Sequence, residues 1–490
     1  MTKKELEALV LSSQIKLQWV TSELDKRDAI IAAQAARIAE LEDKIKMLTA
    51  QLNANSSNSS KPPSSDGFKK PAPKSLRTSS GKKPGGQQGH EGHGFKLKAG
   101  IDHEVPCLPA PCLACPRCST CEFQARDRRN VMDIKILVER TEYQQMEALC
   151  PCRNGELLLG EFPESVHGSK QYGPRLRALG AALVSECAVG LEKASQILRD
   201  MTSCTLSKST ILNFLKDCSA RLERPMEYLR REILEKPVAH FDETGVRVAG
   251  KLHYIHNAST ADTTYQTVSA YRGRRGMDAG GILPDYRGIA VHDCLASYWT
   301  YEGIRMHGVC CAHLLRECKG LQEMYPESAF FRCFPVLLKR MLEAKKKRIQ
   351  HSKADAGRYY LKKYRILYDV LIDMGRMEHP PMENEEKKRG RKARGKANAL
   401  VERLARLKGA VCLFLCSFDV PFDNNQAERD LRHAKVKLKV SGCFRTIDGA
   451  DLFVKFHSFI STAKKRGRTA LQALEFLFQN NPMLALTQGD

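Results

Sequence analysis

The chain has 490 residues, enough for two or three folded domains. Its 79 Lys and Arg residues outnumber its 56 Asp and Glu residues, and the net charge of +23 favours a polyanionic partner, DNA above all. No apolar stretch approaches the ~18 residues that cross a bilayer, and no lipidation signal or basic amphipathic helix favours a membrane surface, so a membrane partner is excluded.

The N-terminal end and the cysteine usage predict a cytoplasmic protein. The first residues, MTKKELEALV, lack the apolar segment of a signal peptide. In the reducing cytoplasm the 18 Cys residues should be buried or bound to metal rather than paired in disulfides. With DNA as its partner, the protein is expected to associate with the nucleoid.

Residues 1–52 carry a heptad repeat. Aliphatic residues recur every seven positions, at Val10, Leu17, Leu24, Ile31, Ile38, Ile45 and Leu52. The companion positions are apolar at both ends and polar in the middle, at Leu6, Ser13, Val20, Arg27, Gln34, Leu41 and Leu48. The pattern predicts a leucine-zipper-like coiled coil through which the chain forms a homo-oligomer, and β-branched residues in the first set mildly favour two strands. One long helix packed on its own protein is the alternative.

Residues 53–100 differ in composition. Ser, Pro, Gly and Lys dominate, and no apolar period survives. Such a segment cannot bury enough surface to offset the entropy of ordering, which predicts a flexible basic linker. It either lies along DNA phosphates or acts only as a spacer.

Residues 101–165 form a Cys-rich segment. Overlapping C-x-x-C steps and a downstream Cys-Pro-Cys supply six candidate ligands, Cys112, Cys115, Cys118, Cys121, Cys150 and Cys152. Thiolate pairs at this spacing can share one tetrahedral ion, which predicts a zinc-ribbon-like module holding Zn²⁺. Thiols without metal are the alternative, because a zinc ribbon prefers a second C-x-x-C. The alternating pattern over 131–149 predicts a pair of strands.

Residues 171–225 have a helical pattern. One helix is predicted over Pro174–Cys187 and a second over Leu191–Met201, and Ser207 has the character of an N-cap that opens a third. Two short helices before one that begins with small hydroxyl residues fit a helix-turn-helix, with Ser207, Lys208 and Ser209 as candidate DNA contacts. Three-helix packing without DNA is the alternative.

Residues 236–445 have the pattern of an α/β domain. Short apolar runs predict strands over 236–244, 251–260, 263–270, 287–294 and 307–310. A mainly helical stretch follows at 311–407, and a C-terminal helical segment is expected at 446–490. Three antiparallel strands followed by strand–helix units predict an α/β sheet flanked by helices.

Three acids in this domain are candidate ligands of a divalent cation. Asp242 and Asp293 each end an apolar strand, and side chains at the carboxyl ends of neighbouring strands converge. Two such aspartates repel each other unless a hard cation such as Mg²⁺ lies between them. Glu428, near the start of a helix capped by Asp423 and Asn424 and expected in its second turn, is the third acid that a two-ion phosphodiester site needs. The cations that flank it are candidate DNA contacts: Arg429, Arg432, Lys435, Lys437 and Lys439.

Several motifs in order resemble the transposases of the insertion-sequence-66 family: HFDETGVRV, GILPDYRGIAVHDCLASYW, CAHLLREC, VPFDNNQAERDLRHAKVKLKVSGCFRT and STAKKRG. NSSNSSKPPSSDG and GKKPGGQQGHEGHG, upstream, resemble the family's linker. The resemblance covers nearly the whole chain. It departs from the family at Cys150-Pro151-Cys152-Arg153, where C-P-x-C-G is common.

The resemblance implies a ribonuclease-H-like core with an Asp-Asp-Glu triad, here Asp242, Asp293 and Glu428, interrupted by a helical insertion at 311–407. It also implies Mg²⁺ or Mn²⁺ as cofactor and two in-line displacements at phosphorus, cleavage at the element's ends and then strand transfer into target DNA. His313 and Arg316 are secondary candidates for DNA contact or for organising the site, although for His313 a satisfied structural role is favoured over either. Accessory proteins of the same element are implied partners.

Two other functions are compatible with parts of the sequence. A catalytically inactive, sequence-specific DNA-binding protein derived from a transposase would share the coil, the cysteines and the basic charge. A recombinase that uses a covalent Tyr, for example Tyr298, would need no carboxylate triad and would work in EDTA.

Overall fold

The computed structural model describes residues 3–53, 58, 89, 100–117, 122–351, 353, 355–381 and 395–487. The chain divides into two compact units, one made of residues 1–70 and 143–490 and the other of residues 71–142. Most of the predicted linker, together with Cys118 and Cys121, lies outside the described residues. None of the described helices is long and apolar enough to cross a membrane.

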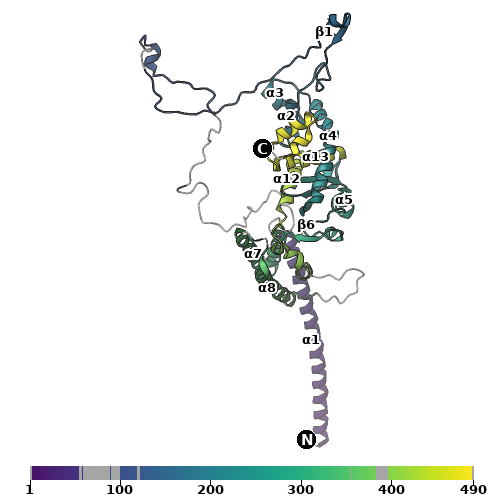
Figure 1. Ribbon diagram of the computed structural model, residues 1–490. Helices are drawn as coiled ribbons and strands as arrows, with labels where there is room; N and C mark the ends of the chain where they lie inside the picture. The colour runs from purple at the N-terminus through teal and green to yellow at the C-terminus, as the bar shows by residue number, and fades with distance from the viewer. Residues whose placement is uncertain are drawn as a thin grey trace. The chain divides into compact units, whose positions relative to one another are not determined.

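The N-terminal heptad segment is one uninterrupted helix, α1 (Lys3–Asn53), as Figure 1 shows. The heptad side chains that the structure describes are exposed, for example Leu24, Ile31, Ile38 and Ile45. In a single chain, these apolar side chains are exposed to water. Self-association through them stays a prediction.

The strand pair predicted over 131–149 is wrong for most of its length. Residues 131–146 contain no strand, and the antiparallel hairpin consists of β1 (Glu147–Cys150) and β2 (Glu156–Leu159). Asn154 and Gly155, in the connection, take positive φ values of 53° and 80°. Asn-Gly adopts this conformation at low cost, so the turn signal, rather than the apolar alternation, locates the hairpin. A short 3-10 helix, η4 (Pro151–Arg153), precedes the turn.

A helical bundle combines the helices of residues 174–235 with the helices near the C-terminus. The predicted helices are present as α2 (Pro174–Ser185), α3 (Leu191–Thr202) and α4 (Lys208–Glu235). They share one buried core with the C-terminal elements α13 (Ile447–Lys465), α14 (Ala470–Phe478) and η6 (Pro482–Leu486). Leu198, Phe214 and Phe459 are fully or almost fully buried in this core. The C-terminal helices therefore complete the bundle instead of forming a separate segment.

The five predicted strands form one mixed sheet of order β5-β4-β3-β6-β7. The strands are β3 (Val238–Val248), β4 (Lys251–Ser259), β5 (Thr264–Ser269), β6 (Ile289–His292) and β7 (Met306–Val309). β3, β4 and β5 are antiparallel, whereas β6 runs parallel to both β3 and β7. Two short elements, α5 (Arg274–Ala279) and η5 (Ala296–Thr300), lie in the connections on either side of β6.

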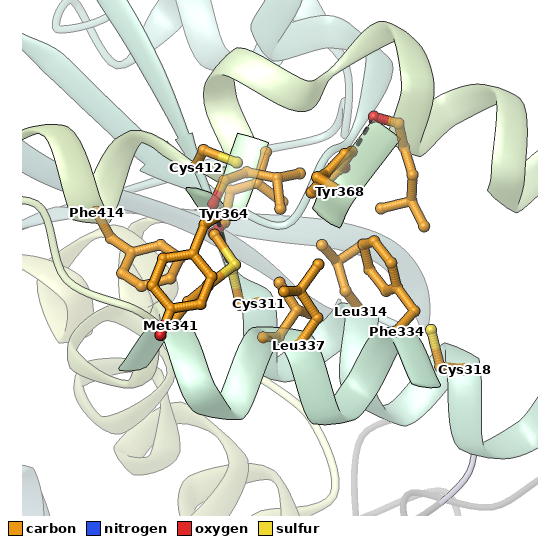
Figure 2. Close-up of a cluster of buried hydrophobic side chains, with 14 of the residues drawn as sticks. Cys311, Leu314, Cys318, Phe334, Leu337, Met341, Tyr364, Tyr368, Cys412 and Phe414 are labelled. Atoms are coloured by element: carbon orange, nitrogen blue, oxygen red, sulfur yellow. Dashed lines mark hydrogen bonds between the residues drawn. The ribbon is translucent and has the colours of Figure 1, made fainter. Parts of the chain in front are cut away.

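The helical insertion, which extends past its predicted end at residue 407, shares an apolar core with β6 and β7, part of which Figure 2 shows. It contains α6 (Cys311–Met324), α7 (Ala329–Gln350), α8 (Gly357–Glu378), α9 (Lys396–Arg406), α10 (Lys408–Val411) and α11 (Leu413–Cys416). Cys311, Cys318 and Cys412 are buried among Leu, Phe and Tyr side chains and behave there as small apolar residues. The Tyr368 hydroxyl satisfies its polarity by donating to the Leu404 carbonyl at 2.9 Å.

The insertion is tied to the segment that leads to α12 (Asn425–Ser441). The buried Lys345 ammonium donates to the carbonyls of Phe418 (2.9 Å) and Val420 (2.6 Å), and the Cys311 N–H donates to the Phe422 carbonyl (3.0 Å). α12 then packs on β3 and β4, while α13 packs on β5. The insertion therefore fixes where the helix that carries Glu428 begins.

Candidate active site

Asp242 lies in the middle of β3, not at its end as predicted, and Asp293 directly follows the end of the neighbouring strand β6. In the parallel pair, His240 of β3 is opposite Val291 of β6. Asp242 and Asp293 each follow this pair by two residues, and side chains two apart on a strand point to the same face. The sheet thus presents both acids at the end of the parallel pairing, on the face of β3 that α12 covers.

Glu428 comes to this face from α12. It lies in the first turn of the helix, not in the second turn as predicted, because the helix begins at Asn425. An acid at this place is favoured by the unpaired N–H groups of the helix N-terminus. The Glu428 side chain is 28% exposed, so it remains accessible to a ligand.

Asn424 fixes the start of α12 against β3, a role that the sequence prediction did not include. Its side chain is 1% exposed, donates to the Phe241 carbonyl at 2.8 Å and places its oxygen 2.8 Å from Nδ1 of His240. Its backbone N–H donates to the Cys310 sulfur at 3.1 Å. Asn424 occupies the predicted N-cap position, but its side chain binds the strand instead of capping the helix.

The charges of the other two predicted acids act on Asp242. Burial raises the pKa of Asp242 well above its usual range, and the negative charges of Glu243, Asp293 and Glu428 raise it further. One hydrogen bond, from the Glu243 N–H at 2.9 Å, opposes this rise. A nearby cation favours the charged form of such a buried acid, and carboxylate oxygens are hard ligands that fit a divalent ion such as Mg²⁺.

A fourth acid, Glu243, lies on the opposite face of β3, where sequence reasoning did not place a functional group. Its side chain is 1% exposed, binds Arg272 Nη2 at 2.8 Å and accepts from the Tyr298 hydroxyl at 2.9 Å. Tyr298 is itself 1% exposed, and burial raises its pKa well above the usual range. Tyr298 therefore supports Glu243 and is not placed to attack DNA.

His313 and Arg316, the secondary candidates, both reach Glu428. Arg316 Nη2 lies 3.3 Å from Glu428 Oε1, and His313 Nδ1 lies 3.7 Å from the same oxygen. The His313 Nδ1 atom is buried without a hydrogen-bond partner, so this histidine is not a satisfied structural one. Burial, followed by the charge of Arg316, lowers the pKa of His313, which favours its neutral form.

Three ligand atoms approach within 4.8 Å of one another at two places in the described part of the chain. These groups are Cys310–His313–Glu428 and Glu186–His433–His457, and the three predicted acids do not form such a tight group. Two ions about 3.5–4 Å apart spread their ligands over two coordination spheres, so a wider spacing of the acids is compatible with a two-ion site.

The basic residues of α12 fall into two environments. Arg429, Arg432 and Lys439 are exposed, whereas Lys435 and Lys437 are half-buried. Burial lowers the pKa of Lys435, and the negative charge of Asp242 opposes this shift, so the Lys435 ammonium acts on the carboxylate site itself.

The predicted contacts at the start of α4 are exposed. Ser207 is the N-cap of the helix, and its hydroxyl accepts from the Thr210 N–H at 3.0 Å, which confirms the predicted cap. Its hydroxyl also lies 2.8 Å from that of Ser209, and Lys208 Nζ lies 3.7 Å from Glu192. Contact with DNA at this helix end stays a prediction.

The cysteine ligands predicted for zinc lie in separate elements. Cys112 is in the 3-10 helix η2 (Ala110–Ala114), with Cys115 directly after it, and Cys150 ends β1 while Cys152 lies in η4. Cys118 and Cys121 are outside the described residues. The zinc module therefore stays a prediction.

Two family models match the sequence. The model described as Transposase IS66 family matches residues 169–452, more than half of the chain, and includes all three predicted acids. The model described as Family of unknown function (DUF6444) matches residues 2–96, which contain the heptad segment and most of the predicted linker. No curated protein matches the sequence.

Proposed function

Because the chain belongs to the Transposase IS66 family, we propose that it cleaves DNA at the ends of its insertion element and joins those ends to target DNA. The observation that carries this proposal is the convergence of Asp242, Asp293 and Glu428, from two neighbouring strands and one helix, on one face of the sheet. The three acids lie far apart in the sequence. The charges of Asp293 and Glu428 raise the pKa of Asp242 only because the fold brings them near it.

The sheet supports a ribonuclease-H-like core. Three antiparallel strands are followed by two parallel ones, and the order β5-β4-β3-β6-β7 places β3, the first strand of this sheet along the chain, at the centre. That central strand carries the first acid, and the second acid directly follows the end of its parallel neighbour, β6. The helical insertion lies between the second and third acids, as the resemblance implies.

Asp242, Asp293 and Glu428 would hold the Mg²⁺ or Mn²⁺ ions. Bound ions would neutralise phosphate charge and lower the barrier to in-line attack by water or a 3′-hydroxyl. The chain's own groups do the rest: Arg316 orients Glu428, Lys435 limits the negative charge at Asp242, and the exposed Arg429, Arg432 and Lys439 bind the phosphate backbone.

The test is cleavage of a DNA duplex that carries the terminal repeats of this element, which lie on either side of the gene, with Mg²⁺ or Mn²⁺ present. We expect wild-type protein to release 3′-hydroxyl ends, and Asp293→Asn or Glu428→Gln to lose more than about a hundredfold in rate while still binding the duplex, since loss of an outer-shell group alone costs 10–100-fold. Asp285→Asn, at an exposed acid of the same domain, is the matched control. Normal cleavage by the two site variants, or full activity in EDTA, would contradict the proposal.

The wider spacing of the acids supports one competing function, a DNA-binding protein derived from a transposase that no longer cleaves. It predicts tight, sequence-specific binding of the same duplex with no cleavage at any divalent-ion concentration. The same assay therefore separates the two functions.

The same proposal gives a role to each of the other parts of the chain. The α1 coil would join the subunits that act at two element ends, the helix-turn-helix and the Cys-rich module with Zn²⁺ would bind the terminal repeats, and proteins of the same element would assist. The work would be done in the cytoplasm, on the DNA of the nucleoid.

A further inference from the structure

Three helices bring a second set of ligand atoms together, away from the carboxylate site. Glu186 follows the end of α2, His433 lies in the middle of α12, and His457 lies in α13. Each offers one ligand atom, and these atoms lie within 4.8 Å of one another. Nothing in the proposed cleavage reaction uses these residues.

The hydrogen bonds of the two histidines leave the Nδ1 nitrogens as the available ligands. His433 Nε2 lies 2.6 Å from the Ser185 carbonyl, and His457 Nε2 lies 2.9 Å from the Asp430 carbonyl. A carbonyl accepts only, so both Nε2 atoms carry the proton, and in the neutral ring Nδ1 then has a lone pair. Histidines that bind metal typically donate their other N–H to a carbonyl or carboxylate in this way.

His457 gives the clearest indication that this group binds a ligand. Its Nδ1 atom is buried without a hydrogen-bond partner, an arrangement that costs free energy unless a ligand satisfies it. The rings of His433 and His457 are stacked, with centroids 4.6 Å apart and planes 7° apart, so the two imidazoles lie directly beside each other. The Glu186 side chain is 22% exposed and leaves a path from solvent.

One cation already contacts this group. The ammonium of Lys464 forms an ion pair with Glu186 Oε1. Lys464 is about half exposed and can move into solvent, whereas the two histidines are held by backbone carbonyls. A metal ion would therefore compete with Lys464 for Glu186.

We propose that Glu186, His433 and His457 form a structural site for a transition-metal ion of the zinc class. Two imidazoles and one carboxylate are the donor set of such ions, while Mg²⁺ prefers oxygen ligands alone. The ion would join α2, which belongs to the helical bundle, to α12 five residues beyond Glu428. It would thereby fix the bundle against the helix that carries the third acid.

Two substitutions that break the same ion pair test the proposal in opposite directions. The full-length protein is stripped with EDTA and equilibrated with buffered Zn²⁺, and bound zinc per chain is measured by atomic absorption. We expect Glu186→Gln to lose one zinc ion per chain at concentrations that fill the wild type, with affinity reduced by about a hundredfold. Lys464→Gln should bind zinc more tightly, by about tenfold, because the competing cation is gone.

Cobalt substitution separates this site from the cysteines. The Co²⁺ spectrum of the wild type should contain visible bands of a nitrogen- and oxygen-bound ion, and Glu186→Gln should remove those bands while any sulfur-to-cobalt bands remain. His351→Gln, at an exposed histidine, is the matched control. Both variants lose the ion pair between Glu186 and Lys464, so an effect of that loss alone would be the same in both. Equal zinc affinity in Glu186→Gln and Lys464→Gln, whether unchanged or weakened, would therefore overturn the proposal.

Discussion

Asp242 determines how the residues of the site respond to pH. A carboxyl group whose folded pKa is above its unfolded value binds its proton more tightly in the folded state. The free energy of unfolding of the metal-free protein therefore falls as pH rises above about 3.8, the usual value for Asp, and keeps falling until the folded pKa is reached. Wherever the Asp242 carboxyl group is ionised in the folded, metal-free protein, its buried charge costs free energy of folding. A bound divalent ion removes the cost, which couples metal affinity to stability.

Asp242→Asn should therefore stabilise the metal-free protein and abolish its activity. At neutral pH in EDTA we expect a higher melting temperature than the wild type, by about 2–4 °C for each kcal/mol of relief. Added Mg²⁺ should stabilise the wild type and leave the variant unchanged, and DNA cleavage by the variant should fall more than about a hundredfold. The stability gap should close near pH 4, where the carboxyl group is protonated. A gap that stays constant from pH 4 to pH 8 would contradict this account.

Asn424→Ala tests how the position of Glu428 is set. The substitution leaves the buried Phe241 carbonyl and one nitrogen of His240 without partners, which should cost about 1–3 kcal/mol in the free energy of unfolding. Because α12 would lose its attachment to β3, we expect DNA cleavage to fall about 10–100-fold with little change in DNA binding. Asn425→Ala, at the exposed neighbour, is the control and should change stability by less than about 0.5 kcal/mol. Equal effects of the two variants would exclude a positioning role.

At the scale of elements, α12 is held in place by an ion pair that the sequence motifs contain but do not explain. Asp430 and Lys465 are 7% and 13% exposed and lie 2.8 Å apart, joining α12 to the end of α13. Lys465 also donates to the carbonyls of Thr260 (2.9 Å) and Thr263 (3.1 Å), in the turn between β4 and β5. The pair thus links two helices and the edge of the sheet.

Asp430→Ala should be strongly destabilising. It leaves the buried Lys465 ammonium without its carboxylate, a change that costs about 3–5 kcal/mol when one partner of a buried pair is removed. Urea unfolding should report this loss. Asp373→Ala removes a 70% exposed acid of α8 and should change the free energy of unfolding by less than about 0.5 kcal/mol. A loss below about 1 kcal/mol for Asp430→Ala would show that water or another anion replaces the carboxylate.

Elements with a strong periodic pattern could be predicted from the sequence. The strands β3 and β6, which position Asp242 and Asp293, contain short apolar runs, and the Ser207 cap precedes a long amphipathic helix, so local patterns determine these elements. The alternation at 131–146 lacks a face to pack on among the described residues around it: Val131 and Ile134 are 90% and 75% exposed. Alternation without burial does not specify a strand.

The rest of the site depends on contacts between distant parts of the chain. The partners of Asn424 and Arg316 are more than a hundred residues away from each of them. A single sequence gives no sign of such pairings. An Asn before a helix predicts a helix cap, and nothing near Asn424 in the sequence indicates that its side chain binds a strand instead. The same limit applies to Glu243, whose position next to Asp242 gives no indication that it faces Tyr298 on the opposite side of the sheet.

At the scale of the whole molecule, α1 exposes an apolar stripe that the described part of this single chain leaves in water. Leu24, Ile31, Ile38 and Ile45 are between 53% and 63% exposed, and they recur on one side of the helix every seven residues. Burying an aliphatic side chain of this size contributes about 1.5–3 kcal/mol, so pairing of two such stripes offsets the loss of freedom on association. We therefore expect α1 to form a coiled coil between copies of this chain.

Charges placed in the stripe should separate the subunits without unfolding them. We expect the double variant Ile31→Asp with Ile38→Asp to have the mass of a single chain by light scattering, where the wild type has twice that mass or more. Ala29→Asp with Ala36→Asp places the same two charges on the opposite side of α1, also at exposed positions, and should leave the mass unchanged.

If both double variants keep the wild-type mass, α1 is a long helix that does not join subunits. If both dissociate, the charge of the helix matters, rather than its apolar stripe. Only loss of mass in the first variant alone assigns subunit pairing to the heptad positions, and that variant would then show whether the carboxylate site cuts DNA without a second copy of the chain.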